Sequence, residues 1–156
     1  MVLISKLILM QKSLIKLFNR DLDKVKEELN SYSDESLIWK VDKNISNCSG
    51  NLALHLVGNL NHFIGATLGE TGYIRQRDLE FSQKNISVSD ILKRIDDTKT
   101  MISETLEKLS DEDLQKEYRR NPFEDYMTTA YFLLHLKSHL AYHLGQINYH
   151  RRLLDT

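Results

Sequence analysis

The sequence predicts an all-α protein that folds as a four-helix bundle in a single domain of residues 1–156. Apolar residues recur every three or four positions over four long stretches, which is the period of an α-helix buried on one side. Only six glycines and one proline interrupt the 156 residues, whereas an all-β sandwich needs turn residues about every 8–12 positions. Two long connections leave the topology open between an up-down bundle and one with a crossover.

The first helix is predicted from Leu3 to Leu29. Lysine, aspartate and glutamate fill one face, while the other face is apolar at helical spacing. The apolar positions are Ile4, Leu7, Ile8, Leu14, Leu17, Phe18, Leu22, Val25 and Leu29. The turn-rich residues 30–50 follow, with one short helix predicted around Asp34–Trp39.

The second helix is predicted from Asn51 to Leu68, with Ser49 or Asn51 as its N-cap. Its apolar side consists of Leu52, Leu56, Leu60 and Phe63. The helix should stop at the Gly69–Gly72 pair, because glycine commonly follows a helix C-terminus. Residues 71–87 (TGYIRQRDLEFSQKNIS) show no sustained periodicity and are predicted to form a long loop.

The third helix is predicted to start near Ser87 or Ser89, since Ser87 and Asp90 fit the Ser-x-x-acid capping pattern. Its apolar stripe consists of Val88, Ile91, Leu92, Ile95, Met101, Ile102, Leu106 and Leu109. In the next connection, Ser110 is predicted to cap a short helical piece and Pro122 to break the chain. The last helix is predicted from Thr128 to Leu154.

The composition argues against several classes of protein. Lysine and arginine number 21 against 22 aspartates and glutamates, so no large basic excess supports nucleic-acid binding. No apolar stretch is long enough for a transmembrane helix, and early lysines (Lys6, Lys12, Lys16) interrupt the N-terminal run too soon for a signal peptide. We therefore expect a cytoplasmic protein with no nucleic-acid or membrane partner.

Cysteine and the common catalytic motifs offer little chemistry. Cys48 is the sole cysteine, which excludes an intramolecular disulfide and a zinc ribbon. No helix start or neighbouring cation is evident for it, so it is predicted to be a small buried or half-buried residue. The chain contains no Glu-x-x-His, His-Glu-x-x-His, Walker A, Gly-x-Ser-x-Gly or Gly-x-Gly-x-x-Gly motif.

The six histidines all fall on two of the four predicted long helices. The second helix carries His55 and His62, and the last carries His135, His139, His143 and His150. His139 and His143 are four residues apart, so their rings share one face about 6 Å apart along the helix axis. On both helices the histidines lie at the margin of the apolar stripe. The two helices therefore turn imidazoles toward a shared edge.

Two imidazoles at this spacing can chelate one divalent ion, and a third completes a three-histidine face with open positions, as in catalytic sites. Nickel, zinc and ferrous iron all suit imidazole, and hydrogen-bonded packing of single histidines is the alternative. Spacing does not choose between His55 and His62, which lie about 10.5 Å apart along the axis. It also leaves the pairs 135/139 and 139/143 in competition. His150 is predicted at the surface or at a second site.

Two segments resemble the DinB-like superfamily, namely Asn51–Gly69 (NLALHLVGNLNHFIGATLG) and His139–Arg152 (HLAYHLGQINYHRR). More narrowly, they resemble a branch of it known only as a domain of unknown function. The resemblance covers most of the chain. It implies an up-down-down-up bundle whose metal triad is one histidine of the second helix and a His-x-x-x-His pair of the fourth. In this sequence the triad is His55, His139 and His143.

The resemblance also implies a nickel, zinc or iron ion and a homodimer. Some related bundles transfer low-molecular-weight thiols, and others are described as metal-dependent hydrolases. The remaining histidines, His62, His135 and His150, fall outside the implied triad and are expected to be its neighbours.

Two hypotheses of function follow. The first is an enzyme whose metal activates water for hydrolysis, or a thiol for transfer to a small substrate. No catalytic base is assigned, and Asn59 and Gln146 are candidates to orient a substrate or a bound water. The alternative is a non-catalytic, metal-binding dimeric module. In that case three helix glycines (Gly58, Gly65, Gly69) allow close approach of another helix or of a second subunit.

Overall fold

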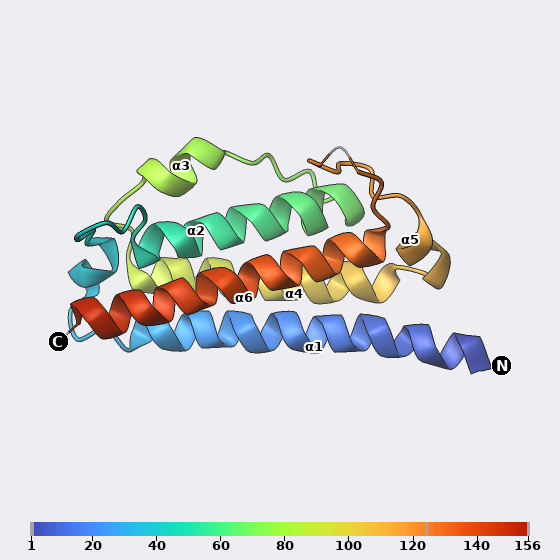
Figure 1. Ribbon diagram of the computed structural model, residues 1–156, viewed down its shortest axis with the longest axis horizontal. Helices are drawn as coiled ribbons and strands as arrows, with labels where there is room; N and C mark the ends of the chain where they lie inside the picture. Colours follow the sequence, from blue (N-terminus) through green and yellow to red (C-terminus); the bar gives the residue numbers. More distant parts are fainter. Residues whose placement is uncertain (1, 124, 156) are drawn as a thin grey trace.

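The computed structural model describes residues 2–123 and 125–155, with side chains from Met10 onward (Figure 1). The described chain is helical. Four long helices dominate it, namely α1 (Val2–Asn30), α2 (Ser49–Leu60), α4 (Val88–Lys108) and α6 (Thr129–Leu154). The shorter elements are α3 (Arg77–Ser82), α5 (Asp111–Gln115), the 3₁₀-helix η1 (Glu35–Trp39) and the π-helical η2 (Asn61–Ala66). The predicted all-α class is confirmed.

The long helices pack as a bundle. α1 packs against α4 and α6, and α2 packs against the same two helices (Figure 1). α1 and α6 run in one direction and α2 and α4 in the other, while the connection after α2 returns along it and carries α3. Fully buried side chains fill the centre, among them Phe18, Leu22, Leu60, Ile95 and Leu136. The predicted apolar positions Ile4, Leu7 and Ile8 lie outside the residues whose side chains are described.

Four predicted helix starts are confirmed by capping hydrogen bonds. The side chains of Asp34, Ser87, Ser110 and Thr128 each accept a bond from a backbone N–H of the helix that follows. Ser110 and Asp113 also form a reciprocal capping box. None of the helices in the described part of the chain combines the length and the apolar character needed to cross a membrane.

The start of α2 differs from the prediction. Its N-cap is Cys48, whose side chain makes no capping hydrogen bond, and Ser49 and Asn51 already lie in the first turn. At the other end, α2 continues as η2, and the helical run stops before Gly69 as predicted. Asn51 therefore has a different role, which concerns the segment predicted as a loop.

Residues 71–87 contain the six-residue helix α3, so the prediction of a loop is wrong over that part. Asn51 Nδ2 donates to the backbone carbonyls of Glu80, at 2.9 Å, and Gln83, at 2.8 Å. These carbonyls lie at the end of α3, where a helix has no partners of its own. A helix of fewer than two turns shows no periodicity in a sequence, and this one is held in place by a side chain of another helix.

Cys48 has the helix start and the neighbouring cation that the sequence did not reveal. Lys84 Nζ lies 3.2 Å from its sulfur, and its thiol donates to Asn51 Oδ1 at 3.0 Å. The side chain is fully buried. The prediction of a buried cysteine is confirmed, whereas the prediction that it lacks such a setting is wrong.

Candidate metal centre

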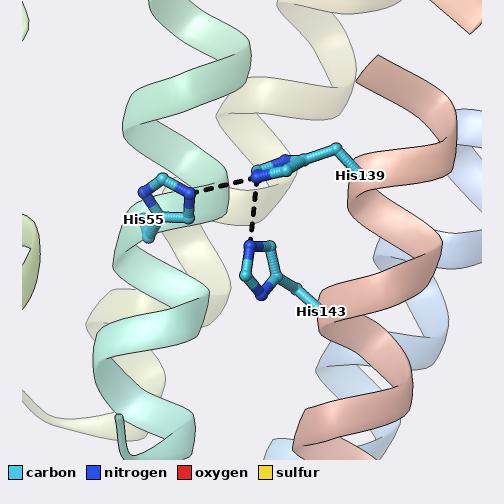
Figure 2. A group of neighbouring side chains, drawn as sticks. All are labelled: His55, His139 and His143. Atoms are coloured by element: carbon cyan, nitrogen blue, oxygen red, sulfur yellow. Dashed lines mark hydrogen bonds between the residues drawn. The ribbon is translucent and has the colours of Figure 1, made fainter. Parts of the chain in front are cut away.

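Three histidines meet between α2 and α6 (Figure 2). His55 projects from α2, and His139 and His143 project from successive turns of α6. The Nε2 atom of His139 lies 3.3 Å from His55 Nε2 and 3.0 Å from His143 Nε2. One nitrogen of each ring lies within 4.8 Å of the other two, which forms a cluster that can hold a metal ion.

Hydrogen bonds at the outer nitrogens orient two of these rings. His55 Nδ1 lies 2.9 Å from Glu80 Oε2, and because a carboxylate only accepts, Nδ1 carries the proton. His143 Nδ1 donates to Gln146 Oε1 at 2.7 Å. In the neutral forms of His55 and His143 the proton is therefore on Nδ1, so the lone pair of Nε2 points into the cluster.

Burial favours the uncharged form of His139 and His143. The pKa of His139 is lowered to about 4, first by burial and then by the neighbouring rings of His143 and His55. Burial also lowers the pKa of His143, although its hydrogen bond with Gln146 acts in the opposite direction. Neutral imidazole is the form that binds metals, so these two residues are ready ligands at pH 7.

The spacing of the nitrogens fits a metal ion. With metal–nitrogen bonds of about 2.0–2.1 Å, ligand nitrogens lie about 3.3 Å apart at tetrahedral angles and about 2.9 Å apart at right angles. The two observed separations, 3.3 and 3.0 Å, fall within that range. His139 Nδ1 is buried and has no hydrogen-bond partner among the described residues. Hydrogen bonding within the cluster therefore satisfies at most part of these nitrogens.

The carboxylate that binds His55 Nδ1 is part of a buried ion pair between Glu80 and Arg75. Arg75 binds the Glu80 carboxylate with two nitrogens, Nε at 2.7 Å and Nη2 at 2.8 Å. Burial alone would raise the pKa of Glu80, but hydrogen bonds from Arg75 and His55, together with their charges, bring it below its usual value. The carboxylate thus stays ionised and holds His55 Nδ1–H. Histidine metal ligands commonly have such a carboxylate partner.

Gly58 makes room for this carboxylate. A Cβ atom at Gly58 would lie 2.0 Å from Glu80 Oε1 and 2.6 Å from its Cδ, far inside van der Waals contact. At Gly65 the nearest atoms belong to Met101 and Thr71, and at Gly69 to Thr105 and the backbone of Gly65. At each of the three glycines, the close neighbours belong to the same chain. Contact of these glycines with a second subunit stays a prediction.

The two predicted orienting residues lie in different places. Asn59, one turn after His55, is 7% exposed, and its Oδ1 has no hydrogen-bond partner in the described part of the chain. It lines a cavity of about 360 Å³ together with His55 and His139. Gln146 instead accepts the hydrogen bond of His143 and donates to Tyr142 Oη at 3.3 Å. It therefore supports a histidine.

His150 is buried, so the prediction that it lies at the surface is wrong. Its Nε2 donates to the Lys40 carbonyl at 2.8 Å, and its Nδ1 accepts from Tyr32 Oη at 2.6 Å. Tyr32 Oη also lies 2.7 Å from Ser49 Oγ. This chain of hydrogen bonds joins the end of α6 to the start of α2. A structural role explains the residue.

His62 and His135 also lie outside the cluster. His62 is half-buried beside Phe63, with ring centroids 4.7 Å apart. The ring centroid of His135 lies 5.1 Å from that of Phe123 and 5.7 Å from that of Phe132. The choice of His55 over His62, and of 139/143 over 135/139, therefore agrees with the placement of the rings.

Glu80 and Arg75 are not predicted from the sequence, because they lie in the segment predicted as a loop. The one trace they leave is Gly58, a glycine within a predicted helix.

A family model described as "Protein of unknown function (DUF1572)" matches residues 7–156. Comparison with curated proteins finds no match.

Proposed function

Because the chain belongs to the DUF1572 family over residues 7–156, a family of unknown function, we propose its function from the site itself: a divalent metal ion held by His55, His139 and His143. The observation that carries this proposal is the convergence of their Nε2 atoms. Glu80 and Gln146 fix the protons of two rings on the far side, at Nδ1. The Nε2 lone pairs of His55 and His143 therefore face His139 Nε2, and a cation between the three nitrogens would bind all of them.

We further infer that the family belongs to the DinB-like superfamily, with its up-down-down-up topology. Two observations support this inference. The first and last long helices run together and the middle two run opposite to them (Figure 1). The histidine cluster also joins one residue of α2 to a pair four residues apart on α6.

The site favours an enzyme over a non-catalytic module. Three protein ligands leave positions for water or substrate, and a divalent ion there supplies Lewis acidity that lowers the pKa of a bound water or thiol. The cavity lined by Asn59 gives a small molecule access to the cluster. We propose hydrolysis or transfer of a low-molecular-weight thiol as the reaction class, with nickel, zinc or iron as the metal.

Elemental analysis tests the metal site. Protein purified without a metal-affinity tag should contain about one equivalent of a divalent metal, since the three ligands meet at one point. The double variant His139→Ala/His143→Ala should contain almost none. His135→Ala, which removes a histidine one turn away on the same helix, should keep the metal. Full metal content in the double variant would contradict the assignment.

Glu80→Gln should weaken metal binding by about 10- to 100-fold, the usual effect of losing a carboxylate behind a histidine ligand. The amide removes the negative charge that stabilises His55 as its metal-bound, Nδ1-protonated form. Competition with a chromophoric chelator measures the affinity. Glu28→Gln is the control. Glu28 Oε2 forms an ion pair with Arg151 Nε at 2.6 Å, and this pair lies away from the histidine cluster. Equal metal affinities of the Glu80→Gln and Glu28→Gln variants would show that Glu80 does not support metal binding.

A further inference from the structure

The cavity beside the histidine cluster is lined by both polar and aromatic side chains. Its lining residues are His55, Asn59, Phe63, Arg75, Arg77, Pro122, Phe123, Phe132, His135, Leu136 and His139. Two of them, His55 and His139, belong to the proposed metal site. The aromatic rings contact one another, with the ring centroids of Phe63 and Phe132 5.4 Å apart and those of Phe123 and His135 5.1 Å apart. A ligand in this cavity therefore meets both polar groups and apolar rings.

The polar groups of this lining are cationic or neutral. Among the described residues, two arginines and no aspartate or glutamate line the cavity, although acidic residues outnumber basic ones in the whole chain. Arg75 directs Nε and Nη2 to Glu80, and its Nη1 has no hydrogen bond to a described residue. Arg77 is exposed and forms no ion pair within the described residues. The cavity thus favours a negatively charged ligand.

Asn59 supplies independent support for a ligand. The residue is more than nine-tenths buried, and its Oδ1 accepts no hydrogen bond from any described residue. A buried polar group without a partner destabilises a protein, so such groups usually have a partner that the chain itself does not supply. Rotating the amide by half a turn places Nδ2, a donor, where Oδ1 lies, so a carboxylate in the cavity, one turn from His55, would accept a hydrogen bond from it.

We propose that this cavity binds a small organic anion with an aromatic or similarly flat apolar body. Its charged end lies toward Arg75, Asn59 and the metal, and its apolar end contacts Phe63, Phe123 and Phe132. Arg77 attracts the anion at the opening of the cavity. This inference rests on the proposed function, because it names the class of molecule that the metal centre would act on. A volume of about 360 Å³ suits a ligand of this size.

Calorimetric titration with defined probes tests the proposal. The probes are phenylalkanoates with one to four methylene groups, the matching phenylalkanols without the charge, and acetate without the ring. We expect at least one phenylalkanoate to bind about tenfold more tightly than its alcohol and than acetate, because the polar and the aromatic side chains of the cavity both contribute. Equal binding of acid and alcohol, or no binding of any acid, would overturn the proposal.

Variants locate the binding. Arg77→Gln and Asn59→Leu should each weaken phenylalkanoate binding by about fivefold or more, whereas Arg152→Gln, which removes an arginine at the far end of α6, should not. Asn59→Leu should also leave the melting temperature unchanged or raised, because it removes a buried amide oxygen that accepts no hydrogen bond from a described residue. A lowered melting temperature with unchanged binding would assign Asn59 to the fold and overturn its role here.

Metal content of the same samples separates the two proposals. If the protein holds metal and binds acids and alcohols alike, the metal site stands and the anion cavity is wrong. If the protein holds no metal but the acids still bind in a manner dependent on Arg77, the metal site is wrong and the anion cavity stands. If the acids bind the metal-loaded protein regardless of Arg77 and Asn59, the ion alone recognises them and the cavity proposal fails.

Discussion

Replacing Gly58 with alanine should lower the free energy of unfolding by about 2–4 kcal/mol. The new Cβ would lie 2.0 Å from Glu80 Oε1, so the carboxylate must leave Arg75 and His55. Breaking a buried ion pair costs about 3–5 kcal/mol, and alanine returns about 1 kcal/mol of helix propensity. The steric effect therefore outweighs the propensity. Chemical denaturation measures the loss.

Gly145→Ala is the matched control. Gly145 lies within α6, and a Cβ atom there would meet no atom within 4 Å. With open space around it, the propensity gain of about 1 kcal/mol should appear as stabilisation. The two glycine-to-alanine changes should therefore have opposite signs. A Gly58→Ala protein as stable as the unaltered one would mean that Glu80 does not occupy the place described.

Asp21→Ala should cost about 3 kcal/mol or more of stability. Asp21 is 2% exposed on α1 and accepts from Lys137 of α6 at 2.5 Å and from Arg20 at 2.7 Å. Lys137 is itself largely buried, so the variant leaves its ammonium without a partner away from water. Removing one member of a buried ion pair lowers the free energy of unfolding by about 3–5 kcal/mol. Asp23→Ala is the control, because its pair with Lys99 is more exposed and should be worth at most about 1 kcal/mol.

The same carboxylate predicts a pH dependence. Burial alone would raise the pKa of Asp21, but hydrogen bonds and charges from Arg20 and Lys137 lower it below its usual value. Its stabilisation is therefore present above the unfolded-state pKa of about 3.9 and is lost as the pH falls through the lower folded-state pKa. The stability difference between the unaltered protein and Asp21→Ala should shrink over that acidic range. A difference that stays constant down to the most acidic pH at which both proteins fold would contradict this assignment.

The sequence predicts the helices well because their determinants are local. The caps at Ser87, Ser110 and Thr128 and the apolar spacing of the long helices depend on residues a few positions apart. The pair His139 and His143 is visible for the same reason. The choice of His55 over His62 is not local, since it depends on how far α2 is displaced along α6. The resemblance to a known family supplied that choice.

Glu80 shows what local patterns leave out. It lies in a helix of six residues whose position depends on Asn51, and its partners Arg75 and His55 are 5 and 25 residues away. None of these contacts recurs at a regular spacing, so periodicity does not reveal them. The burial of His150 is not predicted for the same reason. Its hydrogen-bond partners lie on the segment between α1 and α2, far from it in the sequence.

The hydrogen bonds from His150 through Tyr32 to Ser49 fasten the two ligand-bearing helices together less than two turns from His55. This fastening belongs to the fold and involves no metal. The cluster is consequently assembled in advance, unlike a zinc finger, which is unfolded until its ion arrives. Chelation should therefore leave the far-ultraviolet circular dichroism spectrum unchanged. Tyr32→Phe should weaken metal affinity, because it removes the hydroxyl that links α2 to α6.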